Sequence, residues 1–384
     1  MAYDKMGGSS GKPLSRFGQI VLVLQGGGAL GAYQAGVYEA LHEAGVEPDW
    51  VIGTSIGAIN ASLIAGNPCK DRITRLEEFW RRVRHPAMTS LMAGVPGIGR
   101  PLAAMNTVLG GLPGFFAPNP LAFAGPRMPL RPENAGYYST RPLRRTLEDL
   151  VDFAEIERGR VRLTVGAANT GTGDMRYFDS RKERLGVEHV LASGALPPAF
   201  PPVRIDGELY WDGGILSNTP VEVVFDDNPR RSSIVFAVHM WQPHGDEPDS
   251  IWAVANRQKD LQYASRAVSH IVRQRQIHRL RHIISELAAR LPEEIRADPA
   301  VHEMASYGCT TRMHVVRLLA PRLDNEDHTK DIDFSPAGIE ARWKAGVDDM
   351  RQSLAETPWE GPQDPLEGFV LHELRRGSHV EAMA

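Results

Sequence analysis

Two short segments carry side chains that together could perform acyl transfer: Ser55, in residues 53–57 (GTSIG), and Asp212, in residues 212–214 (DGG). A serine hydroxyl is a poor nucleophile until a base removes its proton. An aspartate can be that base when it is ionised, close to the hydroxyl and partly desolvated. The pattern G-x-S-x-G is typical of a nucleophile elbow, a sharp strand-to-helix turn that exposes the serine. Each segment alone is also compatible with an ordinary glycine-rich turn.

The surrounding sequence predicts a β-α-β unit that would position Ser55. Residues 20–25 and 50–52 are apolar and predict strands, and residues 32–44 have the apolar spacing of a helix. Consecutive parallel strands end at the same edge of a sheet, so the loop at residues 26–31 (GGGALG) is expected beside Ser55. Three glycines in a row let backbone amides face an anion, and the oxyanion of acyl transfer suits this geometry.

Two other interpretations of these segments are weaker. Gly26-x-Gly28-x-x-Gly31 matches a dinucleotide fingerprint, which also expects an acidic residue at the tip of the second strand. Asp49 precedes that strand instead. A Ser–His–Asp triad would need a histidine, and His239, at the end of the predicted strand 234–240, is the best candidate. The elbow follows a single β-α unit, whereas α/β-hydrolases usually have more sheet before the nucleophile, so a Ser–Asp dyad is favoured.

Four motifs in one order resemble the patatin-like phospholipase family: residues 26–31 (GGGALG), 53–57 (GTSIG), 192–197 (ASGALP) and 212–214 (DGG). The resemblance covers roughly residues 18–225 and implies an α/β fold, a three-layer sandwich with a central, mostly parallel sheet. It also implies that Ser55 is the nucleophile and Asp212 its base. The resemblance places the oxyanion hole at the backbone amides of Gly27, Gly28 and Ala29, and general hydrolase geometry adds the amide of Ile56.

The resemblance implies a serine hydrolase that cleaves lipid carboxylic esters, of phospholipase A or lysophospholipase character, through an acyl-enzyme and without cofactor or metal. Leu30 departs from the family, because many relatives carry Arg or Lys there. This departure leaves open another substrate: a non-phospholipid ester, such as hydroxyalkanoate oligomers, or a short-chain thioester. A non-catalytic, membrane-associated scaffold is a third hypothesis, and the intact motifs argue against it.

The sequence divides into a flexible N-terminus (1–18), a catalytic domain (19–225), a C-terminal extension that completes the sheet and adds helices (226–355), and a loosely structured tail (356–384). The extension is similar to that of a bacterial subgroup of the family, with the similarity carried by residues 269–280. Residues 85–137 form an insertion rich in Pro, Gly, Met and Phe, predicted as a lid or pocket wall, with a packed support loop as the alternative. The pocket residues expected are Phe115, Phe116, Leu196 and Pro197.

Composition limits the other function classes. A net charge of −4 gives no general attraction to nucleic acid. The chain has two cysteines, Cys69 and Cys309, without metal-ligand spacing, which favours a reducing compartment. Residues 1–18 lack the apolar region of a secretory signal, so a cytoplasmic protein is expected. The basic helix predicted at 250–291 either packs its apolar stripe on the core, which is favoured, or lies peripherally on an anionic membrane. The oligomeric state is left open.

Overall fold

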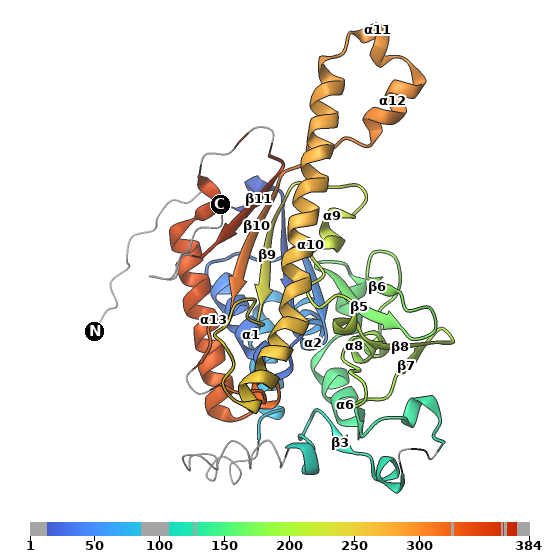
Figure 1. Cartoon of the computed structure of the whole chain (residues 1–384), viewed down its shortest axis with the longest axis vertical. Helices are drawn as coiled ribbons and strands as arrows, with labels where there is room; N and C mark the ends of the chain where they lie inside the picture. Colours follow the sequence, from blue (N-terminus) through green and yellow to red (C-terminus); the bar gives the residue numbers. More distant parts are fainter. Residues whose placement is uncertain are drawn as a thin grey trace, which may run out of the picture.

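Figure 1 shows the computed structural model of the chain, which describes residues 14–85, 107–125, 127, 129–323, 326–361, 364 and 367–374. Within these residues nine strands form one sheet in the order β11-β10-β9-β1-β2-β5-β8-β7, with β6 paired to β5. The strands are β1 (Gln19–Leu24), β2 (Trp50–Thr54), β5 (Arg162–Asn169), β6 (Met175–Asp179), β7 (Val203–Ile205), β8 (Glu208–Asp212), β9 (Ser233–His239), β10 (Met313–Leu319) and β11 (Phe369–Glu373). A separate antiparallel pair joins β3 (Ala117–Pro118) to β4 (Tyr138–Ser139).

The sheet is parallel from β11 through β5 and antiparallel from β5 to β6, β8 and β7. Leu24 at the end of β1 pairs with Gly53 of β2 on one side and with Val238 of β9 on the other. The chain therefore leaves β1, β2 and β9 at the same edge of the sheet, as the β-α-β prediction requires.

Helices cover both faces of the sheet, so the predicted three-layer α/β architecture is confirmed (Figure 1). One core cluster joins alternate side chains of β1, such as Leu22, to the first helices and the last helix; the other joins the opposite face, such as Val23, to α9 and α10. The helices are α1 (Ala32–Glu43), α2 (Ile56–Ala65), α3 (Arg72–Arg82), α6 (Arg141–Leu150), α7 (Phe153–Glu157), α8 (Val187–Ser193), α9 (Glu222–Phe225), α10 (Ile251–Arg290), α11 (Glu293–Arg296), α12 (Pro299–Ser306) and α13 (Pro336–Glu356).

Capping residues explain where the long C-terminal helices begin. Ser250 precedes α10, and its hydroxyl accepts the Ala253 amide at 3.2 Å. Ser335 precedes α13 and accepts the Gly338 amide at 3.1 Å, with Pro336 at the first helical position. Both are the N-cap arrangement that satisfies otherwise unpaired first-turn amides, so the start of α13 follows from its sequence.

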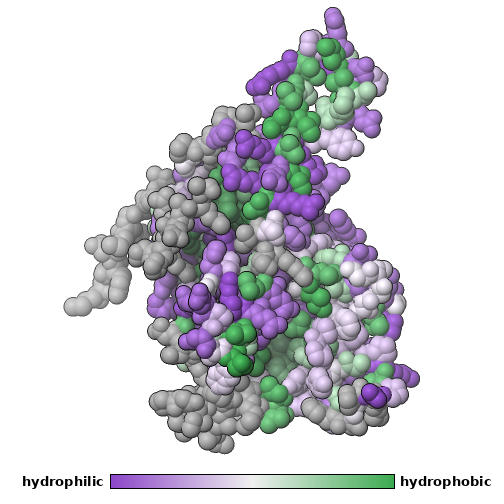
Figure 2. Space-filling view, viewed as in Figure 1, coloured by the Kyte–Doolittle hydropathy of each residue, from purple (hydrophilic) through white to green (hydrophobic). Residues whose placement is uncertain are grey.

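The C-terminal region differs from the sequence-based expectation in two places. The tail beyond residue 356 contains β11, which pairs in parallel with β10 at the edge of the sheet. The apolar stripe of α10 packs on the core only in part: Ala264 and Ile271 are buried, but Leu280 and Leu287, in the part that projects from the body with α11 and α12 (Figure 1), are 60% and 58% exposed. Figure 2 shows apolar side chains gathered on this projection, where Ile295 and Met304 are also exposed. Within the described part of the chain, no helix is long and apolar enough to cross a bilayer.

Candidate active site

Ser55 occupies a sharp turn between β2 and α2, with φ 57° and ψ −126°. The turn fits only because its neighbours lack side chains. A Cβ on Gly53 would lie 2.3 Å from the Gly57 carbonyl carbon, and a Cβ on Gly57 would lie 2.2 Å from the Leu24 carbonyl oxygen. Both separations are far below van der Waals contact, so the two glycines of the motif are required by the close approach of β1, β2 and α2. The strained φ of Ser55 is the feature expected of a nucleophile elbow.

Asp212 is the last residue of β8, and the sheet register places it level with Ser55. Thr54 pairs with Gly166 of β5, and the next residue of β5, Ala167, pairs with Asp212. The Asp212 amide donates to the Ala195 carbonyl at 3.0 Å. The antiparallel hairpin therefore returns Asp212 to the edge of the sheet where Ser55 lies.

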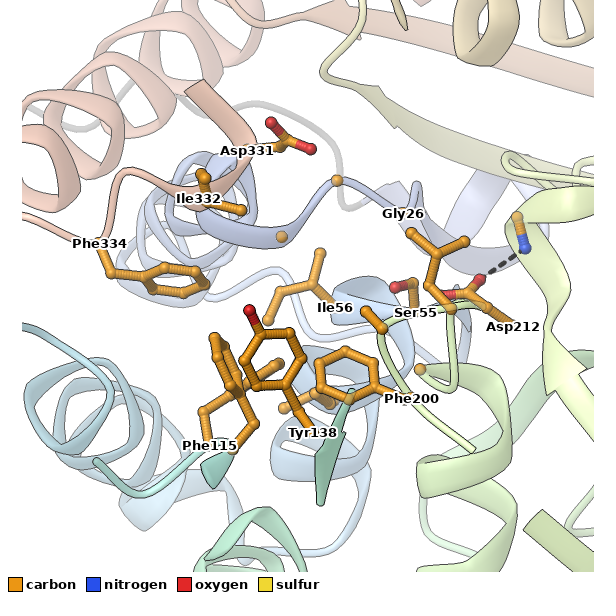
Figure 3. Close-up of a pocket in the computed structure, with 18 of the residues that line it drawn as sticks. Gly26, Ser55, Ile56, Phe115, Tyr138, Phe200, Asp212, Asp331, Ile332 and Phe334 are labelled. Atoms are coloured by element: carbon orange, nitrogen blue, oxygen red, sulfur yellow. Dashed lines mark hydrogen bonds between the residues drawn. The ribbon is translucent and has the colours of Figure 1, made fainter. Parts of the chain in front are cut away.

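The Asp212 carboxylate is buried and lies beside the Ser55 side chain (Figure 3). Its Oδ1 atom accepts the Gly214 amide at 2.7 Å. Burial raises the pKa of Asp212 from 3.8 to about 7, although the nearby Ser55 hydroxyl and the Gly214 amide lower it. A carboxylate with this pKa is a far better proton acceptor near neutral pH than an exposed aspartate.

The glycine loop after β1 is anchored by two side chains from distant parts of the chain. Asn218 donates its side-chain amide to the Gly26 carbonyl at 3.1 Å, and the Trp241 indole donates to the same oxygen at 2.7 Å. The Gly26 amide donates in turn to the Asn218 carbonyl at 3.2 Å. Gly28 begins a short 3-10 helix, η2 (Gly28–Gly31), and Ile56 begins α2, so their amides are first-turn donors without a partner inside their own helices.

A buried network of polar side chains holds this loop against α1, α2 and α3. The Gln25 carbonyl accepts from the Gln34 side chain at 2.6 Å, and the Gln34 side-chain oxygen accepts from Asn60 at 2.9 Å. Asn60 also donates to the Gly31 carbonyl at 3.0 Å and accepts from the Trp80 indole at 3.2 Å. The network connects β1, α1, α2 and α3, so it fixes the glycine loop relative to the elbow helix. No sequence motif marks this network, because each of these polar residues lies alone among apolar ones.

A cavity of about 200 Å³ opens beside Ser55 and Asp212. Its aromatic wall combines side chains from separate segments, among them Phe115, Phe200 and Phe334 (Figure 3). The ring centroids of Phe116 and Phe200 are 5.5 Å apart, and those of Phe115 and Phe334 are 5.8 Å apart. The lining residues are Gly26, Gly27, Gly28, Ser55, Ile56, Ile59, Thr107, Val108, Phe115, Phe116, Tyr138, Gly194, Leu196, Ala199, Phe200, Asp212, Gly214, Asn218, Trp241, Tyr263, Asp331, Ile332 and Phe334.

This cavity brings together most of the residues selected from sequence. Ser55, Asp212, Gly27, Gly28, Ile56, Phe115, Phe116 and Leu196 all line it, whereas Ala29 and Pro197 are not among the lining residues. Residues 86–106 of the predicted lid lie outside the described residues, but Thr107 and Val108 from its described part reach the cavity. Tyr263, Asp331, Ile332 and Phe334 come from the C-terminal extension and were not predicted, since no local motif marks them.

The residues behind the two weaker interpretations lie elsewhere. His239 is buried in the sheet and is not among the cavity-lining residues; burial, together with the nearby charge of Arg317, lowers the pKa of its imidazole to about 3. Asp49 lies at the start of β2, where its carboxylate accepts the Ile20 amide at 2.8 Å. The Asp49 amide and carboxylate therefore bond to β1 at the sheet edge opposite the glycine loop. A dinucleotide bound at that loop could not place its ribose near Asp49.

Among the described residues, one group has the side-chain types and proximity to hold a metal ion: His42, Glu47 and Cys69, with ligand atoms within 4.8 Å of one another. Glu47 is already paired with the Arg72 guanidinium and accepts the Tyr38 hydroxyl at 2.8 Å. None of the three lines the cavity beside Ser55. The group is therefore separate from the candidate active site.

Comparison with known proteins agrees with the motifs. The profile of the family described as "Patatin-like phospholipase" matches residues 22–225, and a second, described as "Patatin phospholipase", matches residues 261–366. The chain is 29% identical over 205 residues to "Patatin-like phospholipase domain-containing protein 6" of Mus musculus, which covers 53% of this chain and 12% of that protein. It is 26% identical over 244 residues to "Lysophospholipase nte1" of Aspergillus terreus, covering 62% of this chain and 13% of that one.

Among solved structures, VipD from Legionella pneumophila aligns with 88% of this chain and 67% of its own, at 17% identity and a TM-score of 0.38. The first family profile alone spans more than half of the 384 residues. The chain belongs to the patatin-like phospholipase family. It spans only about an eighth of the length of the curated relatives named above.

Proposed function

We propose that this protein is a serine acyl hydrolase that cleaves lipid carboxylic esters with Ser55 as nucleophile and Asp212 as base. The observation that carries the proposal is the position of the Ser55 side chain beside the buried Asp212 carboxylate at the wall of an apolar cavity. A buried carboxylate with a raised pKa is suited to proton transfer, and aromatic walls are suited to an acyl chain.

The reaction would proceed in two steps, formation and hydrolysis of an acyl-enzyme. Asp212 takes the Ser55 proton as the serine oxygen bonds to the ester carbonyl carbon, and the carbonyl becomes an oxyanion. The first-turn amides of Gly28 and Ile56, with that of Gly27, would stabilise this charge. The intermediate collapses, the ester C–O bond breaks, and the proton on Asp212 passes to the leaving alcohol. In the second step Asp212 takes a proton from water, hydroxide attacks the acyl-Ser55 ester, and the carboxylic acid leaves with Ser55 reprotonated.

The cavity supports a substrate whose acyl part is apolar. Among the described residues that line it, the ionisable carboxylates are Asp212 and Asp331, and none is Lys or Arg. Any phosphate head group would therefore bind outside the cavity rather than within it. The relatives named phospholipase and lysophospholipase favour a phospholipid or a single-chain lysophospholipid.

A second substrate class is favoured by a specific observation at Leu30. Its side chain is 4% exposed and packs in the core, so this chain offers no charge where many relatives carry Arg or Lys. A neutral ester or thioester would not need that charge. Hydrolysis of phospholipid vesicles and of soluble p-nitrophenyl esters and acyl thioesters, measured side by side, distinguishes the two classes.

Peripheral contact with a lipid surface follows if the substrate is a membrane lipid. Binding to anionic vesicles by sedimentation, with neutral vesicles for comparison, tests this contact. The lid role of residues 85–137, the cytoplasmic location and the domain boundaries stay predictions.

Comparison of wild type with Ser55→Ala on lysophosphatidylcholine tests the proposal. Ser306→Ala, which removes a serine hydroxyl on α12 that bonds only to the Glu303 carbonyl at 2.7 Å, is the matched control. We expect Ser306→Ala to keep full hydrolysis and Ser55→Ala to lose it. Wild-type rates from Ser55→Ala on every ester tried would overturn the proposal.

A further inference from the structure

The dipeptide Lys-Asp occurs twice in the C-terminal extension, and the two copies meet in space with their charges crossed. Lys259-Asp260 lies on α10, and Lys330-Asp331 opens the short 3-10 helix η7 (Lys330–Ile332). The Lys259 ammonium lies 2.7 and 3.0 Å from the two Asp331 carboxylate oxygens, and the Lys330 ammonium lies 2.7 Å from Asp260 Oδ1. We refer to these two contacts as the crossed ion pairs.

The two pairs differ in burial, and both hold η7 against α10. The side chains of Lys330 and Asp260 are 3% and 1% exposed, whereas those of Lys259 and Asp331 are 33% and 22% exposed. A buried ammonium or carboxylate is stable only while its partner stays in contact. Lys330 also lies over the Trp241 ring, 5.3 Å from its centroid. A shift of η7 along α10 would separate both pairs, so the two pairs together hold η7 in one register.

The segment held by the crossed ion pairs contacts the glycine loop directly. The Asp331 carbonyl oxygen lies 2.2 Å from where a Cβ on Gly28 would be, and Gly28 has φ +55°. Trp241, over whose ring Lys330 lies, donates to the Gly26 carbonyl of the same loop. Figure 3 shows Asp331 and Ile332 beside the loop that carries Gly26. The loop therefore lies between β1 and a segment supplied by the C-terminal extension.

We infer that the crossed ion pairs position the glycine loop for catalysis, so that Lys259, Asp260, Lys330 and Asp331 are positioning residues of the active site. The catalytic part of this inference rests on the proposed function. Backbone donors must be held within about 0.5 Å of their working geometry, and a misplacement of about 1 Å can cost roughly a hundredfold in rate. The C-terminal extension then helps to position the backbone amides of the active site.

The exposed pair provides the experiment, because changing the buried pair could unfold the protein. Lys259→Met and Asp331→Asn each remove one partner, and the double variant Lys259→Asp/Asp331→Lys exchanges the charges. We expect each single variant to lower kcat about tenfold with KM nearly unchanged, since the loop amides would bind an oxyanion that forms only in the transition state. The charge-exchanged double variant should recover most of the rate.

Lys344→Met is the matched control, because Lys344 pairs with Asp348 within the exposed face of α13. It should leave kcat unchanged. Single variants with wild-type kcat, or a double variant slower than both single variants, would overturn the catalytic part of the inference.

Hydrogen–deuterium exchange of the peptide spanning residues 25–31 tests the positioning without any substrate. Faster exchange in Lys259→Met, reversed in the charge-exchanged variant, would support the inference, and exchange identical to wild type would overturn it. If wild type hydrolyses no ester, the proposed function fails, but this exchange measurement still decides whether the crossed ion pairs hold the loop.

Discussion

The Ser55 amide donates to both oxygen atoms of Ser193, at 3.1 Å to its carbonyl and 3.0 Å to its hydroxyl. Ser193 ends α8, and its hydroxyl donates to the Gly166 carbonyl of β5 at 2.7 Å. The backbone of Ser55 is thereby fixed to the strand next to β2. The motif at residues 192–197 lines the cavity with Gly194 and Leu196, and its serine also sets the position from which Ser55 projects.

Ser193→Ala should therefore slow hydrolysis, by about tenfold in kcat, and lower the free energy of unfolding by about 1 kcal/mol for the lost buried hydrogen bond. Ser180→Ala is the control, since the Ser180 hydroxyl also bonds to the β5 backbone, accepting the Leu163 amide at 3.0 Å, but lies outside the cavity lining. Steady-state kinetics and thermal unfolding separate the two effects. An equal kcat for both variants would show that Ser193 only stabilises the fold.

Asp212→Asn should reduce kcat by at least about a hundredfold, because the amide retains the shape of the carboxyl but cannot accept the serine proton. Asp206→Asn, in the exposed turn that leads into β8, is the control and should remain fully active. Binding of a non-hydrolysable substrate analogue should be unchanged in both variants. Near-full turnover by Asp212→Asn would assign the base to another residue.

The raised pKa of Asp212 predicts how activity and stability change with pH. The base works when ionised, so kcat/KM should rise with pH, with its midpoint near the pKa of about 7, and then level off. Because this pKa lies above the ordinary 3.8, the folded protein keeps a proton that the unfolded chain has lost between these two values. The free energy of unfolding should therefore fall as pH rises across that window, and Asp212→Asn should abolish this part of the fall. A flat activity profile from pH 5 to 8 would contradict the assignment.

Gly28→Ala tests the close packing of the glycine loop. The new methyl group would approach the Asp331 carbonyl, and the backbone at φ +55° disfavours a side chain. Gly45→Ala is the control, because Gly45 has φ +70° with nothing within 4 Å of an added Cβ, so it bears the backbone strain alone. We expect Gly45→Ala to lose about 1 kcal/mol of stability, and Gly28→Ala to lose more stability than that and most of its hydrolysis. Similar activity in the two variants would show that loop packing does not limit the reaction.

The positions of Ser55 and Asp212, the proposed catalytic pair, could be predicted from sequence because local signals specify them. GTSIG predicts the elbow at Ser55, and apolar runs predict β1 and β2, whose loops must meet at one edge of the sheet. The hairpin that carries Asp212 follows from residues 203–212.

The supports of the site could not be predicted, because they join residues far apart in sequence. Trp241 bonds to Gly26 across 215 positions, and Lys259 bonds to Asp331 across 72. A single sequence contains no signal for such pairs, since each lysine or tryptophan has many possible partners. β11 was missed for a similar reason, because five residues in a tail form a strand only when β10 offers its edge.

Covalent labelling with a fluorophosphonate probe, mapped by peptide mass spectrometry, tests the central claim most directly. The probe mimics the ester carbonyl and modifies a serine only where a base activates it. We predict one adduct, on Ser55, that is absent from Ser55→Ala and strongly slowed in Asp212→Asn, with the control Asp206→Asn labelled at the wild-type rate. An unlabelled Ser55 in folded protein, or an adduct on another serine that persists in Ser55→Ala, would contradict the assignment.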